Sequence, residues 1–342
     1  MAEVGAAVVL TGAGLVCPAA TGTAELLAAD PDAGPDPMHN GAGGWFDPVP
    51  HLGARGWKYL SPATRYLLAA GVLAIADAAL DPAALPAESM GVVVGTNLAA
   101  NPVVERLDRT VIAEGAAMLS PAEAPNFSVN IPAGHVSMRH GMRAFNVSLT
   151  NPVVAGVESV LMLAASIRRG RAAVGIAGAT EERPEDGWAS EGACCFVVEG
   201  ADHADRRAAP GRAAPGRAAI IGGFCRFVPD GSGPAVWERA VGRPLRELLA
   251  RATDGAALPY AGPGGYGGFG RRVDDHCRDV SAAAGVDLEA RRYLGDDGRY
   301  LTASPLLQLA GLLAEHGRGL VVATAPHGHV AALLIDPVPT HS

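Results

Sequence analysis

The sequence lacks an excess of positive charge. Its 27 Lys and Arg residues are outnumbered by 35 Asp and Glu residues, and the formal net charge is −8. Because it has no basic cluster beyond short arginine runs, the chain is not expected to bind nucleic acid. No apolar run reaches the roughly 20 residues that cross a bilayer, and no positively charged segment precedes the apolar stretch near the N-terminus. Neither a membrane span nor a signal peptide is therefore expected.

The sequence also lacks the cysteine spacing of a metal site. Its five cysteines are scattered and form no CxxC motif, so zinc is not expected and no other cofactor is indicated. Cys194 and Cys195 are adjacent in the apolar run ACCFVVEG, which is typical of small core residues in a strand. These features predict a reduced, cytoplasmic protein.

What the chain does have is enough apolar sequence for a large core: 49% of its 342 residues are hydrophobic and 18% are charged. Strand and helix patterns alternate along both halves, which predicts an α/β architecture rich in parallel strands. Gly12-Ala13-Gly14 follows a first strand that we expect to end at Thr11. The third glycine of a dinucleotide-binding fingerprint is missing there, so that interpretation is disfavoured.

Other patterns predict individual elements. Ser61 followed by Pro62 predicts the cap of a helix that runs to Leu80, and Met90–Gly95 is predicted to be a buried strand. We expect a helix over Pro102–Leu119, irregular structure over Asn126–His140, and a helix over Ala235–Thr253 that is kinked or broken before Pro244. The repeated AAPGR within residues 202–218 predicts an exposed loop.

The stretch from Ala144 to Gly178 reads as a strand, a sharp turn, a long helix and a second strand. Enzymes with α/β folds place a nucleophile at such a turn, where the helix N-terminus stabilises negative charge. The turn here offers Asn151, Pro152, Val153 and Val154, none of which is a nucleophile. The local sequence therefore predicts a catalytic scaffold without its chemistry.

Several segments resemble β-ketoacyl synthases (ketosynthases). They are VVLTGAGLVCP, ATRYLLAAGVLAIADAAL, MGVVVGTNLAA, IAEGAAMLSPAEAPN, the stretch NVSLTNPVVAGVESVLMLAASIRRGRAAVGIAG and the closing LVVATAPHGHVAALLI. The resemblance implies a thiolase-like α/β fold, with two similar βαβαβαββ halves in a five-layer αβαβα sandwich, and an obligatory dimer. It divides the chain into a first half over residues 1–201, the low-complexity loop 202–218, and a shortened second half over residues 219–342.

The family's chemistry needs a cysteine that carries the acyl chain and two histidines that support decarboxylation and the enolate. Matching the family's motifs places the cysteine at Val153, the first histidine at Gly262 in AGPGGYGGFG, and the second at Pro305 in YLTASPLLQLAG. All three catalytic side chains are replaced, so the resemblance implies that the chemistry is absent.

Ketosynthase-like chains without the cysteine are known as chain length factors, or KSβ, of type II polyketide synthases. The resemblance therefore implies a heterodimer with an active ketosynthase (KSα), which presents the acyl carrier protein. The growing chain lies in a tunnel at their interface. Many such factors carry glutamine at the cysteine position, and this departure to valine favours a divergent branch that serves reduced or polyene chains.

Matching the family's interface helix places four residues on the side that faces the chain: Val104, Asp108, Val111 and Ile112. Asp108 is either an exposed helix acid or a carboxylate inside the tunnel, where desolvation raises a pKa. His135 and His140 are interpreted as structural histidines.

Two further hypotheses stay open. The chain could be an enzyme, such as an acyltransferase or a cyclase, whose catalytic residues lie at other positions, namely Asp108 or the closing-loop residues His327 and His329. Alternatively, the chain could be a purely structural partner that stabilises a ketosynthase without shaping its product.

Overall fold

The computed structural model describes residues 7–32, 44–185, 187–207, 217–229, 231–252, 257–263 and 267–338. The two halves of the chain repeat one strand order. Counted within each half, the order is 3-2-4-5-1, with the fifth strand antiparallel to its neighbours. The predicted thiolase-like fold with two similar halves is confirmed.

The first half contributes five main strands, and a short β2 (Ala20–Thr21) pairs with the first of them. They are β1 (Val8–Cys17), β3 (Met90–Gly95), β4 (Phe145–Leu149), β5 (Val174–Glu181) and β6 (Gly192–Gly200). The second half contributes β7 (Ala218–Phe227), β8 (Leu258–Ala261), β9 (Leu288–Ala290), β10 (Gly319–Thr324) and β11 (His329–Asp336). β1 and β7 join the halves through two residue pairs, Val9 with Ala219 and Leu10 with Ala218.

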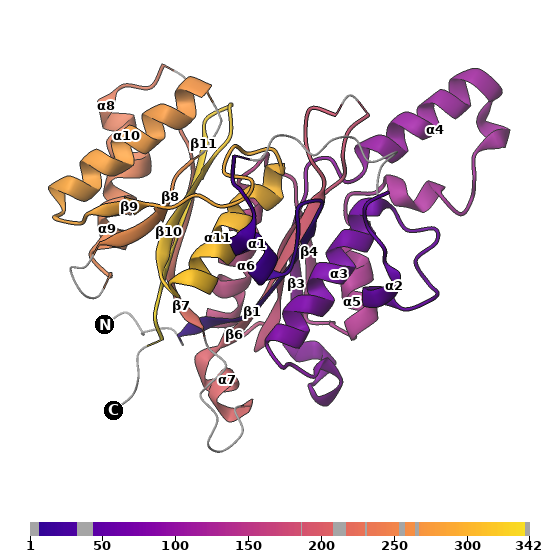
Figure 1. Ribbon diagram of the computed structural model, residues 1–342, viewed down its shortest axis with the longest axis horizontal. Coiled ribbons are helices and arrows are strands. Elements are labelled where there is room, and N and C mark those ends of the chain that lie inside the picture. The colour runs from indigo at the N-terminus through magenta and orange to yellow at the C-terminus, as the bar shows by residue number, and fades with distance from the viewer. Residues whose placement is uncertain are drawn as a thin grey trace.

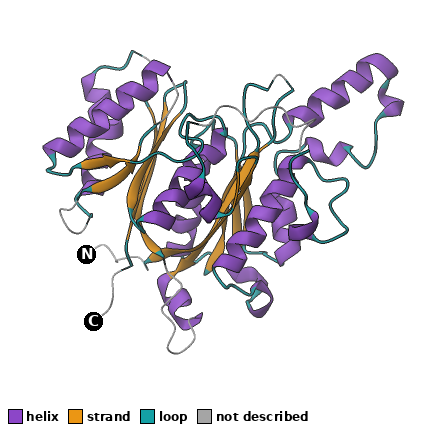
Figure 2. Ribbon diagram, viewed as in Figure 1, coloured by secondary structure: helices purple, strands orange, loops and turns teal. Residues whose placement is uncertain are grey.

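The helices make three of the five layers (Figures 1 and 2). Helices α3 (Pro62–Asp77) and α5 (Ile131–His140) cover the outer face of the first sheet. The middle layer holds α6 (Ala155–Arg168) and α11 (Ser304–Glu315), and the far layer holds α9 (Arg243–Leu249) and α10 (Gly267–Ala283). The remaining helices are α1 (Thr23–Ala28), α2 (Val49–Leu52), α4 (Asn101–Glu114), α7 (Ala201–Arg207) and α8 (Pro234–Trp237).

Strand β1 continues through Gly12-Ala13-Gly14 instead of ending at Thr11 as predicted. Helix α3 packs so closely on β1 that a Cβ at Gly12 would lie 2.3 Å from the carbonyl oxygen of Ala74. A Cβ at Gly14 would lie 2.2 Å from the carbonyl oxygen of Ala70. These glycines therefore permit the close approach of a helix to a strand and do not form a nucleotide-binding turn.

Three further expectations are corrected. Helix α4 ends at Glu114, not Leu119, because Gly115 adopts a φ of 94°. Residues Ile131–His140 are helical rather than irregular, because Pro132 suits the first turn and the apolar positions 132, 133 and 136 share a buried face. The predicted loop 202–218 begins as helix α7, and residues 208–216 lie outside the described residues.

Other expectations are confirmed. The Ser61 hydroxyl accepts a hydrogen bond from the Thr64 N–H and caps α3, with Pro62 in the first turn. The helix before Pro244 is interrupted by a π-helical segment, Glu238–Gly242. Cys194 and Cys195 are buried in β6, as expected of small core residues in a strand.

All five cysteines are free, and none of the described helices is long and apolar enough to cross a membrane.

Candidate functional site

The turn between β4 and α6 keeps a conformation that suits few residues. Val153 has a φ of 59°, although a β-branched side chain is strained in the left-handed region. Its side chain is buried with 3% exposure, and α6 starts two residues later at Ala155. On the outer side of the turn, the Asn151 amide donates to both carboxylate oxygens of Glu158, at 2.9 and 2.8 Å. The backbone of a nucleophile turn is therefore present, with a valine at its strained position.

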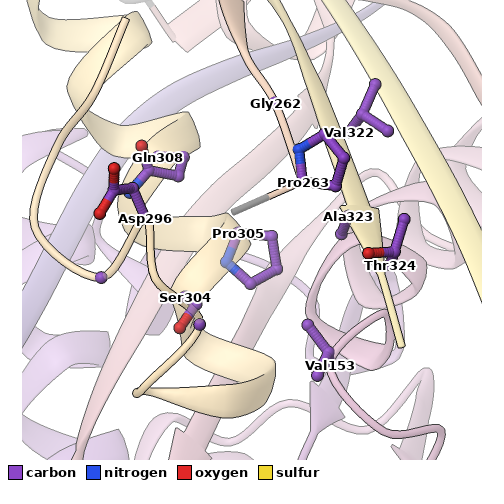
Figure 3. Close-up of a pocket in the computed structure, with 12 residues that line it drawn as sticks. Val153, Gly262, Pro263, Asp296, Ser304, Pro305, Gln308, Val322, Ala323 and Thr324 are labelled. Atoms are coloured by element: carbon purple, nitrogen blue, oxygen red, sulfur yellow. The ribbon is translucent and has the colours of Figure 1, made fainter. Parts of the chain in front are cut away.

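One small cavity brings together the three positions that the motif match singled out. Val153, Gly262 and Pro305 all line it, although they come from three distant segments (Figure 3). Its volume is about 20 Å³, which is room for about one water molecule. These three residues supply no thiol, imidazole or other group that can exchange a proton. The three positions that the motif match singled out therefore lie together in the folded chain.

The polar residues of this cavity are mostly held by structural hydrogen bonds. Gln308 donates to the Tyr293 carbonyl at 3.0 Å, and the Ser304 hydroxyl accepts from the Tyr300 N–H at 3.0 Å. Asp296 accepts from Arg292 at 2.5 Å. The Thr324 hydroxyl is buried without a partner among the described residues, and Asp296, a carboxylate of the same lining, is paired with Arg292.

A buried carboxylate that sequence reasoning missed joins the two halves beside this turn. Glu181, at the end of β5, accepts from the Asn97 and Leu98 N–H groups, with the latter at 2.7 Å. It also accepts from the hydroxyl of Thr302, which lies in the 3₁₀ turn Leu301–Ala303 before α11. Burial raises the pKa of Glu181 to about 7. Its one sequence signal was the acidic pair Glu181-Glu182 at the end of an apolar strand.

The neighbouring carboxylate Glu182 is buried with 1% exposure, and its Oε2 has no hydrogen-bond partner in the described part of the chain. Burial raises its pKa to about 7. Nearby, Glu191 accepts from the Tyr66 hydroxyl at 2.8 Å and from the Trp45 indole at 2.9 Å. Glu191 is thus held by two aromatic side chains of the first half, whereas one oxygen of Glu182 is buried without a partner there.

The histidines lie in other surroundings. His327 lines a different cavity with Val228 and Phe269, and the His329 ring packs on Phe227 with the ring centroids 5.1 Å apart. His135 and His140 are on α5; burial lowers the pKa of both, that of His140 to about 4. No group of three His, Cys, Asp or Glu side chains within the described ranges could hold a metal ion.

The predicted tunnel residues lie on one face of α4, which projects from the body of the molecule (Figure 1). Val104 is 42% exposed, Val111 is 40% exposed and Ile112 is 84% exposed, and Asp108 is exposed between them. The structure thus places all four on one accessible stripe of the isolated chain.

Further exposed apolar residues follow this stripe in the chain. Of the thirteen large hydrophobic residues that are exposed in the described ranges, six lie between residues 104 and 129. Among the described strands, β4 is the last of its sheet and pairs with β3 alone, so its outer edge is open. We call α4, the connection to α5, and the outer edge of β4 the open face. Its exposed apolar residues are Val104, Val111, Ile112, Met118, Phe127 and Val129.

Comparison with known proteins agrees with the geometry. Residues 39–198 match the N-terminal domain of beta-ketoacyl synthases. Over this range the chain is similar to the β-ketoacyl synthases. It is 24% identical over 300 residues to 3-oxoacyl-[acyl-carrier-protein] synthase 2 of Vibrio cholerae, a match that covers 84% of this chain and 70% of that enzyme.

A second relative is the tetracenomycin polyketide synthase ketoacyl synthase beta subunit of Streptomyces glaucescens. It is 26% identical over 190 residues, which are 52% of this chain and 46% of that subunit, so the match spans less than half of that relative.

Solved structures share the fold. The ishigamide ketosynthase/chain length factor superposes with a TM-score of 0.71 at 23% identity, covering 97% of this chain and 100% of that one. A ketosynthase in complex with its type II acyl-carrier protein, bound to the hexaketide, gives a TM-score of 0.77 at 17% identity, covering 97% and 100%.

Proposed function

We propose that this chain is a non-catalytic chain length factor. It heterodimerises with an active ketosynthase and shapes the tunnel that holds the growing polyketide chain. The observation that carries the proposal is the cavity where Val153, Gly262 and Pro305 meet on an otherwise retained ketosynthase scaffold. A condensing enzyme needs a nucleophile and proton-transfer groups at these positions, and valine, glycine and proline supply neither.

The open face supports the partner role. An exposed apolar surface beside an unpaired sheet edge is typical of a protein–protein interface. In the proposed complex, the chain has no activity alone and acts as a subunit of a β-ketoacyl synthase, and the ketosynthase binds the acyl carrier protein. The side chains of Val104, Asp108, Val111 and Ile112 then line the tunnel and limit the length of the chain by their bulk. We further propose a reduced or polyene chain as the product.

The first experiment is the native mass of this chain, expressed alone and with the ketosynthase encoded nearest to it. We expect a one-to-one complex and a more soluble chain in co-expression. A stable homodimer that ignores the ketosynthase would contradict the proposal.

The second experiment tests the tunnel. Val104→Phe and Ile112→Phe should shorten the product of the reconstituted complex, because each adds bulk where the chain ends. Val49→Phe is the matched control, since Val49 is 46% exposed on helix α2, which is not part of the open face. If the product length is unchanged while the heterodimer stays intact, the tunnel role is wrong and the chain is a purely structural partner.

The reconstituted complex also tests the alternative that other residues of this chain carry out catalysis. Replacement of His327, His329 or Asp108 by alanine should leave product formation intact in the proposed complex. Loss of product with the heterodimer intact would favour an acyltransferase or a cyclase instead.

A further inference from the structure

A large groove runs between α6 and β7, with a volume of about 1160 Å³. One wall is the outward side of α6, and the other includes β7 and Arg251, which follows α9. It begins at Leu149 and Asn151, where the open edge of β4 ends, and then follows the helix after that strand. The groove is therefore continuous with the open face. Its apolar lining includes Leu161, Met162, Ala165, Ile221 and Phe224.

The groove concentrates positive charge in an acidic protein. Five arginines and a single carboxylate, Glu158, line it, whereas the whole chain carries a formal net charge of −8. We call this feature the arginine groove. Its arginines are Arg168, Arg169, Arg171, Arg226 and Arg251.

These arginines differ from others on the same molecule. Elsewhere, Arg207 pairs with Glu199 at 2.6 Å, and Arg217 pairs with Asp77 at 2.5 Å. Over the described part of the chain, none of the five groove arginines has a carboxylate partner. Glu158 is already engaged by the Asn151 amide.

Two of the arginines are held in place by carbonyl groups, which do not neutralise them. Arg168 donates to the Ile220 carbonyl at 2.6 Å, and Arg226 donates to the Cys225 carbonyl at 2.8 Å. Burial and the neighbouring charge of Arg251 lower the pKa of Arg168, which shows that the two guanidinium groups act on each other. The groove is thus a positive surface on which a single carboxylate, Glu158, faces five arginines.

The position of the groove determines which dimer its positive charge favours or disfavours. A two-fold dimer that pairs β4 with a second β4 uses the same surface of both copies, and the groove is continuous with that surface, so the grooves of both copies lie beside the interface. Two copies of this chain would bring ten arginines together, because each copy contributes five. Like charges at an interface disfavour that pairing, and opposite charges favour another.

We infer that the arginine groove selects the partner. It disfavours pairing of this chain with itself and favours a ketosynthase subunit that presents carboxylate side chains to the groove. This inference rests on the proposed heterodimer and adds the chemistry by which the mate is chosen.

The test reverses the charge of three exposed groove residues in one variant, Arg169→Glu, Arg226→Glu and Arg251→Glu. The half-buried Arg168 is left intact so that the fold is preserved. The control variant is Arg55→Glu, Arg206→Glu and Arg271→Glu, which makes the same change in net charge at exposed sites outside the groove. Circular dichroism and thermal unfolding of each purified chain verify the fold.

With the co-expressed ketosynthase, the groove variant should bind about 100-fold more weakly than the wild type, and the control should bind like the wild type. Added salt should weaken the wild-type complex more than the complex of the groove variant, because screening acts on the lost charge pairs. Equal binding of all three chains would overturn the inference and leave the heterodimer proposal standing.

A second arm needs no ketosynthase. Wild-type chain mixed with an isotope-labelled groove variant should form a one-to-one dimer in native mass spectrometry, because the reversed charges now match. Wild type alone should stay monomeric at low salt. If the mixture forms no more dimer than wild type alone, the inference is wrong. Failure of wild type to bind the ketosynthase at any salt would instead count against the proposed function, and this arm would still decide on the groove.

Discussion

The turn between β4 and α6 separates two regions of opposite character. On its inner side, Val153 faces a cavity of about 20 Å³, closed by residues of both halves. On its outer side, Asn151 lies at the start of a groove of about 1160 Å³ beside an open strand edge. The inner side is closely packed, whereas the outer side is open in the isolated chain, and the proposed partner role depends on this contrast.

The largest loss of stability is expected from adding one methyl group at Gly156, in the closed interior. A Cβ there would lie 2.1 Å from the carbonyl oxygen of Thr302, where α6 meets the second half. Gly156→Ala should lower the free energy of unfolding by about 3 kcal/mol, measured by urea denaturation. Gly134→Ala is the control, because it lies in helix α5 with nothing within 4 Å, and it should gain up to about 1 kcal/mol. Equal effects would contradict close packing between the halves.

The buried acid Glu182 should make the free energy of unfolding depend on pH. Burial raises the folded-state pKa of Glu182 from 4.5 to about 7, so the folded state holds more protons than the unfolded state in this window. The stability from this group is present below pH 4.5 and is lost as pH rises towards 7, by about 2 to 3 kcal/mol. Glu182→Gln should remove this share of the slope in urea titrations between pH 4.5 and 7, while Glu181, whose pKa burial also raises to about 7, keeps its own share.

Glu199 is the control, because its pKa is shifted in the opposite direction and its effect on stability has the opposite pH dependence. Although burial opposes it, hydrogen bonds from His203, Arg207 and Thr11 lower its pKa to about 2. Its contribution is present above pH 4.5 and is lost as pH falls towards 2. Glu199→Gln should therefore change the acid limb and leave the slope between pH 5 and 7 as it is in the wild type. The Glu182 interpretation fails if its glutamine variant keeps the wild-type slope.

A smaller effect tests the strain at the turn. Val153 and Val154 are adjacent valines, both buried, but Val153 has a φ of 59° and Val154 a φ of −69°. Glycine removes the same side chain from each and relieves strain only at Val153. Val153→Gly should be less destabilising than Val154→Gly by about 1 to 2 kcal/mol in chemical denaturation. Equal losses would mean that the turn is not strained.

The smallest effect on the lone chain is expected on the open face. Ile112 is 84% exposed, so Ile112→Ser should change the unfolding free energy by less than about 0.5 kcal/mol. The same variant should bind the ketosynthase more weakly in native mass titrations, because it removes apolar area from the proposed interface. A large loss of stability in the isolated chain would show that α4 is already covered there.

Much of the fold could be predicted from local signals. The cap at Ser61, the strand pattern over Met90–Gly95 and the break before Pro244 depend on residues close in sequence, and the structure confirms them. The continuation of β1 through Gly12 could not be read locally, because its cause is the distant helix α3. Helix α5 was missed because its buried face depends on packing against α3.

For the site, the sequence by itself determined that the nucleophile turn has no nucleophile, and its family resemblance singled out Val153, Gly262 and Pro305. Only the tertiary structure decided that these three positions share one cavity and that Glu181 reaches across to Thr302. It also assembled the arginine groove from α6, β7 and the end of α9, segments that are short arginine runs or single residues in the sequence. The physical reason is range: caps and strand patterns act between neighbours, whereas cavities and charge clusters arise where distant segments meet.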